Sequence, residues 1–104
     1  MKKPTSVKVM GFDYDIVWEP QQIHDGKEYN WGMCDNEKQC IQVWDGLTGQ
    51  RKRQVLVHEI IHVIFELMAV VHGNEENVCD CVSLGLYCVL NDNPELMKWI
   101  TNEK

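Results

Sequence analysis

The chain has 104 residues, 44% of them hydrophobic and 9% aromatic. This length fits one domain with a modest core and leaves no room for a second. Because 16 acidic side chains outnumber 10 basic ones, the formal net charge is -6, and the overall field repels nucleic acid and anionic membrane surfaces. We therefore expect one domain over residues 1–104, with no nucleic-acid partner and no membrane partner.

The N-terminal residues and the cysteines both bear on the cellular compartment. Residues 1–6 are basic and polar, and neither an apolar stretch nor a secretory cleavage site follows them. Five cysteines, an odd number, predict free thiols in a reducing compartment, so we expect a cytoplasmic protein. Cys34 and Cys40 flank a hairpin turn expected at residues 35–39, and whether these two cysteines pair stays open.

The first half of the chain has the alternating pattern of half-buried strands. Apolar residues alternate over residues 7–9 and 12–18, and the phase shifts at residues 10–11, where a tight turn or a bulge would explain the shift. Residues 29–33 and 40–44 are two further strand candidates. We expect these strands to form a small antiparallel sheet.

The second half of the chain is helical in pattern. A long segment covers residues 51–72, a break follows at residues 73–74, a second segment covers residues 75–90, and a short tail follows Pro94. The basic run at residues 51–53 is typical of the solvated start of a helix. The sequence therefore predicts an α+β fold, with a small sheet followed by two helices.

Four polar residues interrupt the apolar long segment, and we expect it to bury them: His58, Glu59, His62 and Glu66. The first three form the motif HExxH. Its spacing puts both imidazoles on one helix face, within reach of a single zinc ion, with the glutamate beside a water on that ion. Two buried core histidines with an ion-paired glutamate are the structural alternative.

A catalytic zinc site needs a third protein ligand and an open fourth position. His72 lies on the same predicted helix about 15 Å beyond His62, too far to bind the same ion. The elongated motif with a third histidine is absent, because Phe65 and Met68 stand where its glycine and histidine would be. The better candidate is Glu76, near the start of the next helix, with the adjacent Glu75 as an open alternative.

The second helix carries a further part of the pattern. HExxH followed on a second helix by Glu-x-x-x-Asp resembles the signature of the gluzincin metallopeptidases, and Glu76 and Asp80 match it. The order of elements looks like that of the compact gluzincins encoded by phages and prophages, which have ImmA/IrrE-type proteins as relatives. The resemblance implies a zincin-like fold, a Zn²⁺ cofactor, and hydrolysis of a protein or peptide substrate.

The resemblance also assigns roles to residues. The zinc ligands would be His58, His62 and Glu76. Glu59 would be the general base that takes a proton from the zinc-bound water. Asp80 would accept a hydrogen bond from a ligating histidine, and Tyr87, two turns further on, is a candidate oxyanion donor beside its alternative as a core tyrosine.

Two other hypotheses explain the same residues without catalysis. One is a zinc-stabilised regulatory module of phage or prophage origin that binds a protein, and the other is a metal-free interaction domain. Glu59 favours catalysis, because a structural zinc site needs no base. The strand at residues 40–44 would accept an extended peptide if it forms the sheet edge, and the tryptophans at positions 18, 31 and 44 would line a pocket or the core.

Overall fold

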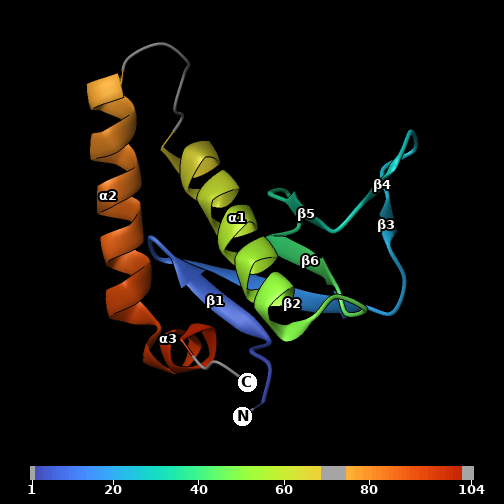
Figure 1. Cartoon of the computed structure of the whole chain (residues 1–104). Helices are drawn as coiled ribbons and strands as arrows, with labels where there is room; N and C mark the ends of the chain where they lie inside the picture. Colours follow the sequence, from blue (N-terminus) through green and yellow to red (C-terminus); the bar gives the residue numbers. More distant parts are fainter. Residues whose placement is uncertain (1, 69–74, 102–104) are drawn as a thin grey trace.

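A computed structural model of the chain describes residues 2–68 and 75–101, without the side chains of residues 75–77 and 79–81. Its main sheet contains the strands β1 (Ser6–Val9), β2 (Phe12–Glu19), β5 (Gly32–Asp35) and β6 (Cys40–Trp44). A two-stranded ribbon contains β3 (Ile23–His24) and β4 (Tyr29–Asn30). The helices are α1 (Gly49–Leu67), α2 (Glu75–Asp92) and α3 (Pro94–Ile100). The fold is a small α+β fold, as the sequence predicts (Figure 1).

The turn expected at residues 10–11 is present between β1 and β2. Met10 and Gly11 have φ angles of 51° and 89°, and Val9 pairs directly with Phe12. Positive φ at both central residues is the backbone of the two-residue turn that matches the twist of a hairpin. The phase shift in the sequence therefore marks a hairpin and not a bulge.

The sheet is mixed, so the expectation of an antiparallel sheet was wrong. The strand order is β1-β2-β6-β5, and β2 pairs with β6 in parallel, with Asp15 opposite Cys40. After β2 the chain first forms the ribbon and β5. It then forms β6, which lies beside β2 and runs in the same direction. The alternating pattern specifies which face of a strand is buried, but it does not specify the direction of the partner.

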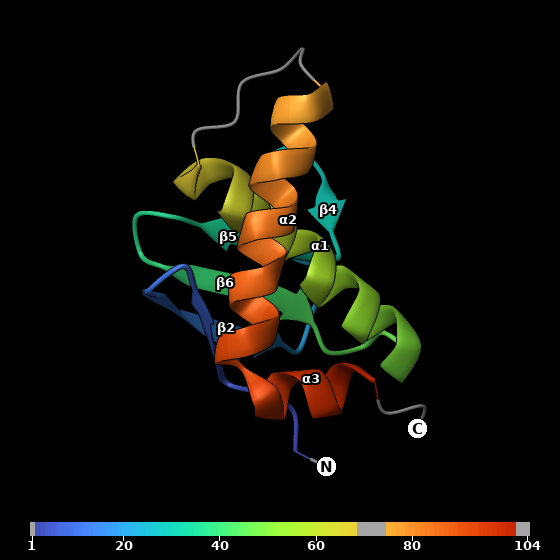
Figure 2. The same cartoon turned by 90° about the vertical axis from the view of Figure 1, so that its left-hand side faces the viewer.

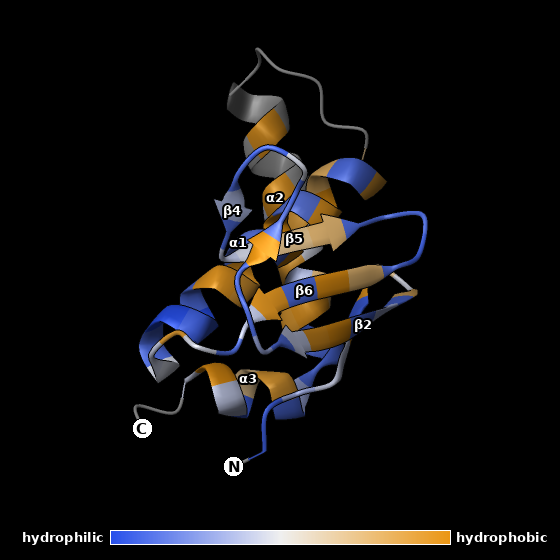
Figure 3. Ribbon diagram, turned by 90° about the vertical axis from the view of Figure 1, so that its right-hand side faces the viewer, coloured by the Kyte–Doolittle hydropathy of each residue, from blue (hydrophilic) through white to orange (hydrophobic). Residues whose placement is uncertain are grey.

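The edge of the sheet also differs from expectation. β6 lies between β2 and β5, and β5 is the terminal strand on that side. In Figure 3 the strands β2, β6 and β5 lie in front of α1 and α2, which cover the opposite face of the sheet. The strand at residues 40–44 is therefore not an edge of the sheet, and the edge on this side is β5.

Helix α1 is amphipathic, and it does not bury its polar residues as a group. Its buried residues are Val55, Leu56, Glu59, Ile60, Val63 and Ile64. His58, His62 and Glu66 are exposed, so the expectation that they are buried was wrong. The helix lies across one face of the sheet, and only one stripe of it can contact that face. The last predicted residues of this helix, 69–72, lie outside the described part of the chain.

Helices α2 and α3 complete the core. Gly85 of α2 lies so close to α1 that a Cβ atom there would be 2.5 Å from Cγ2 of Ile64. In α3, Leu96 and Trp99 are buried, and the Trp99 ring lies 5.5 Å from that of Trp18 in an edge-on contact. No helix within the described ranges has the length and apolar character that a membrane span requires.

Candidate metal centre

His58 and His62 converge on the exposed side of α1. Their Nε2 atoms are 3.1 Å apart, and their ring centroids are 4.7 Å apart with an interplanar angle of 72°. Residues four apart lie one turn apart on the same helix face, which explains why the HExxH spacing brings the two rings together. The structure thus brings the two predicted histidine ligands together.

The separation of the two nitrogens fits a shared zinc ion. Zinc binds histidine nitrogen at about 2.0–2.1 Å in tetrahedral geometry, so two such ligands lie about 3.3 Å apart. The observed 3.1 Å is close to this distance. It also suits a hydrogen bond between two neutral rings, in which one ring donates and the other accepts.

Glu59 lies beside this pair on the buried side of the helix. Only 7% of its surface is exposed, and it is the one charged side chain among the buried residues that the structure describes. Burial raises the pKa of the Glu59 carboxyl above its usual value, and the nearby His58 and His62 oppose that rise. A raised pKa makes a carboxylate a stronger proton acceptor than an ordinary surface glutamate.

Gly32 of β5 lets the edge strand approach Glu59. A Cβ atom at this position would lie 2.8 Å from Cγ1 of Val55 and 3.1 Å from Oε2 of Glu59. Any other residue would therefore push the strand and the helix apart or move the carboxylate. The sequence analysis did not identify Gly32, since the contact joins residues that are 27 positions apart in the chain.

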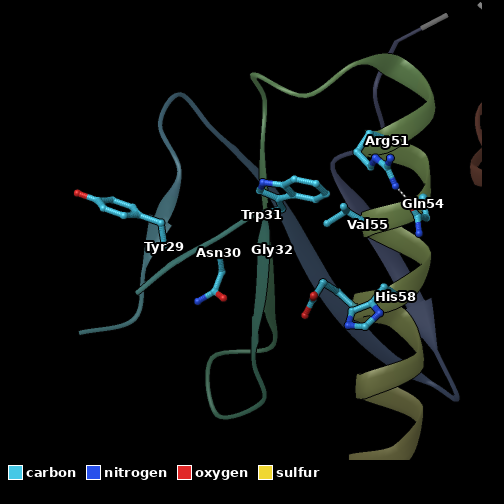
Figure 4. A pocket seen from close by; sticks show the side chains of 9 residues that line it. Tyr29, Asn30, Trp31, Gly32, Arg51, Gln54, Val55 and His58 are labelled. Atoms are coloured by element: carbon cyan, nitrogen blue, oxygen red, sulfur yellow. Dashed lines mark hydrogen bonds between the residues drawn. The ribbon is translucent and has the colours of Figure 1, made fainter. Parts of the chain in front are cut away.

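A pocket of about 390 Å³ opens beside His58 and Glu59, between α1 and the segment that leads into β5 (Figure 4). Its lining residues are Tyr29, Asn30, Trp31, Gly32, Arg51, Gln54, Val55, His58 and Glu59. Of the three tryptophans considered for a pocket, Trp31 lines it. Trp18 instead packs against Trp99.

The described structure does not place a third predicted metal ligand beside His58 and His62. The backbones of Glu75, Glu76 and Asp80 belong to α2, but their side chains lie outside the described part of the structure. Figures 1 and 2 show α2 and β5 on opposite sides of α1. Among the side chains that are described, no three histidine, cysteine, aspartate or glutamate residues are grouped as metal ligands.

Tyr87 lies away from the pocket. Its side chain is 66% exposed, and it is not among the pocket residues. Gly85 marks the face of α2 that contacts α1, and a residue two positions further along a helix points to a different face. The structure therefore does not bring Tyr87 to His58 and Glu59, and we do not retain it as an oxyanion donor.

The cysteines take no part in this centre within the described structure. Cys34, Cys40 and Cys88 are free. In the β5–β6 hairpin Cys34 pairs with Ile41, and Cys40 pairs with Asp35. Cys34 and Cys40 are therefore offset by one residue and point to opposite faces of the sheet, which prevents a disulfide between them.

Comparisons with known proteins do not add to this geometry. The chain matches no protein-family model, no curated protein and no solved structure at a significant level. The arguments for a function therefore depend on the residues of this chain: two convergent imidazoles, a buried carboxylate and a pocket beside them.

Proposed function

We propose that the protein is a zinc-dependent peptidase of the cytoplasm in which His58 and His62 hold the ion and Glu59 is the general base. The observation that carries this proposal is the 3.1 Å approach of the two Nε2 atoms beside Glu59, a residue with only 7% of its surface exposed. A site with a purely structural metal would not require such a carboxylate.

The zinc ion and Glu59 would have different roles in the proposed reaction. When bound, a zinc ion would make a water ligand more acidic and polarise a peptide carbonyl. Glu59 would accept the proton of the attacking water and deliver it to the leaving amine. Its side chain lies against the backbone of Gly32, and this packing restricts the position of the proton acceptor.

The proposal includes a third ligand from α2. Glu76 is our candidate, with Asp80 as the residue that positions a ligating histidine, because their spacing matches the gluzincin pattern. The side chains of Glu76 and Asp80 lie outside the described part of the structure. Their assignment therefore depends on the spacing of the sequence, and metal analysis tests it. Glu75 is the matched control, because it is the same residue type one position away.

A peptide substrate fits the edge of the sheet. β5 ends the sheet on the side of the pocket, and an edge strand offers unpaired backbone groups to an extended chain. Gly32 at the start of β5 lies against Glu59, so a peptide paired with β5 would pass beside the general base. We therefore propose that the substrate binds as an added strand.

The metal assignment is tested by metal analysis of protein purified without added metal. We expect one zinc per chain in the wild type and in Glu75→Ala, and loss of zinc in His62→Ala and Glu76→Ala. A wild type without zinc would overturn the proposed centre. Full zinc content in Glu76→Ala would overturn the third ligand and leave the two histidines in place.

Catalysis is tested with Glu59→Gln. This variant should keep its zinc and lose hydrolysis of a mixed peptide library by about 100-fold or more, because it removes the proton acceptor. Equal hydrolysis by the variant would exclude Glu59 as the base. If the zinc-loaded wild type cleaves nothing in the library, the zinc-stabilised binding module is the better description.

A further inference from the structure

The three basic residues at the start of α1 have separate environments. Lys52 forms an ion pair with Asp45 at 2.9 Å. Arg53 donates from Nε to the backbone oxygen of Trp99 at 2.9 Å. Of the three, only Arg51 lines the pocket beside Glu59. The run that resembled a solvated helix start therefore contributes one cation to the candidate site.

Arg51 is held in place by two neighbours. Its guanidinium carbon lies 5.4 Å from the centroid of the Trp31 ring, and its Nη1 donates to Oε1 of Gln54 at 2.5 Å (Figure 4). Among the side chains that the structure describes, no carboxylate forms an ion pair with Arg51. A guanidinium has five N–H donors in a plane, so the group is oriented and still has donors for a planar anion.

The two ends of the pocket have opposite charge. Arg51 is at one end and Glu59 is at the other, with Val55 between them on α1. Arg51 precedes His58 by seven residues, which corresponds to about 10 Å along the helix axis. An anionic group of a ligand is repelled by Glu59 and attracted by Arg51, so it would bind at the end of the pocket that is distant from the two histidines.

We infer that Arg51 and Trp31 form a subsite for a carboxylate group of a peptide ligand. The position along the peptide rests on the proposed function. β5 starts at Gly32 beside the pocket and runs away from it to Asp35. A peptide that pairs with β5 in the antiparallel direction therefore has its C-terminal side at Arg51. At about 3.3 Å per extended residue, 10 Å corresponds to about three residues.

The ligand class is thus a peptide with an acidic group within about three residues on the C-terminal side of the scissile bond. A free C-terminal carboxylate and an acidic side chain present the same chemistry. The net charge of -6 means that the protein as a whole repels acidic peptides. A preference for acidic peptides would therefore come from the local contact with Arg51.

The test is a titration of the purified protein with three short peptides, followed by the indole N–H signal of Trp31 in nitrogen-15 NMR spectra. The peptides are N-acetyl-trialanine with a free C-terminus, the same peptide as its C-terminal amide, and an amide with glutamate as its last residue. We expect at least one of the two anionic peptides to bind about tenfold more tightly than the neutral amide, and the better of the two identifies the source of the carboxylate.

Charge-matched variants make the test specific. Arg51→Gln should remove the preference for the anionic peptide, and Arg51→Lys should restore part of it, because lysine keeps the charge and loses the planar stacking on Trp31. Lys98→Gln, which makes the same change of charge at an exposed site on α3, should leave the preference intact. Equal binding of the three peptides by the wild type, or a full preference in Arg51→Gln, would overturn the inference.

The outcomes separate this inference from the proposed function. Zinc in the protein without a preference for anionic peptides would reject the subsite and leave the metal centre. A preference that depends on Arg51 in a protein without zinc would keep the carboxylate subsite and reject the peptidase. A preference that persists in Arg51→Gln would assign the carboxylate to another cation, such as the metal.

Discussion

Glu59 and Gly32 lie against each other where the edge strand approaches the proposed catalytic helix. The first comes from a recognisable motif, whereas the second is one of seven glycines in the chain. A local spacing of four residues is enough to predict that His58 and His62 converge. The contact of Gly32 with Glu59 depends on the position of β5 in the strand order of the sheet. No local sequence pattern specifies that position.

Gly32→Ala tests this contact. The new Cβ atom would lie 2.8 Å from Val55 and 3.1 Å from two atoms of Glu59, so we expect the carboxylate to move. The free energy of unfolding should fall by about 1–3 kcal/mol, and hydrolysis should fall further than this loss explains, with zinc content unchanged. Urea unfolding, metal analysis and peptide hydrolysis on the same preparation check this.

Gly26→Ala is the control for the loss of a glycine. A Cβ atom there would meet nothing within 4 Å, although the φ angle of 98° makes alanine strained by about 1 kcal/mol or more. This variant should therefore lose stability and retain hydrolysis. If Gly32→Ala behaves in the same way as Gly26→Ala, the contact with Glu59 has no functional role.

At the scale of elements, the close approach of α2 to α1 depends on one glycine. Gly85→Ala improves the intrinsic helix propensity by about 1 kcal/mol, but its Cβ atom would lie 2.5 Å from Cγ2 of Ile64. We expect the steric term to exceed the propensity term, with a net loss of about 1–3 kcal/mol in urea unfolding.

The double variant with Ile64→Val identifies the cause. Shortening Ile64 makes space for the new methyl group, so the double variant should be less destabilised than the sum of the two single variants. Strict additivity would show that the two helices do not meet at this point.

Asp45 joins three segments of the chain through its carboxylate. Lys3 and Lys52 both form ion pairs with Oδ1 of Asp45, and their hydrogen bonds lower the pKa of Asp45 below its usual value of 3.8. A lowered pKa in the folded state means that the ion pairs stabilise the fold above pH 3.8, and that this contribution is lost as the pH falls through the folded pKa.

Asp45→Asn should therefore lower the free energy of unfolding at pH 7, by less than about 1 kcal/mol because solvent screens the exposed pairs. The difference from the wild type should shrink in high salt and should vanish as the pH falls below the folded pKa of Asp45. A difference that persists in acid would point to packing instead of charge. Urea unfolding at pH 7 and at low pH, each with and without salt, measures it.

Most of the elements were predictable from the sequence, and most of their arrangement was not. The hairpin at Met10 and Gly11 and the start of α2 follow from local signals. The parallel pairing of β2 with β6, and hence the identity of the edge strand, depends on contacts between residues far apart in the chain. The same limit applies to the site. The motif on α1 was predictable, whereas the sequence did not specify which of the three tryptophans and which of the three basic residues line the pocket.

At the scale of the whole molecule, a bound ion would add to the stability of a small core. Binding to the folded state alone stabilises a protein by about 2.7 kcal/mol at 100 times the dissociation constant. For a domain of this size, we expect removal of the metal by a chelator to lower the thermal midpoint by about 10 °C or more. Thermal unfolding followed by circular dichroism, with and without chelator, measures the shift.

His62→Ala provides the comparison. This variant removes an exposed proposed ligand without opening the core, so its midpoint should lie near that of the chelated wild type and should not respond to chelator. An equal response of both proteins would mean that the ion binds elsewhere in the molecule.

The parallel pairing of β2 with β6 has a consequence for the order of folding. Two local hairpins, β1–β2 and β5–β6, flank this pairing, and each can close without the other on a timescale of about 1–10 μs. The pairing joins residues such as Asp15 and Cys40, and the intervening chain must close as a loop first. Helix α1 follows β6 and packs mainly against β5 and β6. Folding should therefore be limited by the docking of the two hairpins.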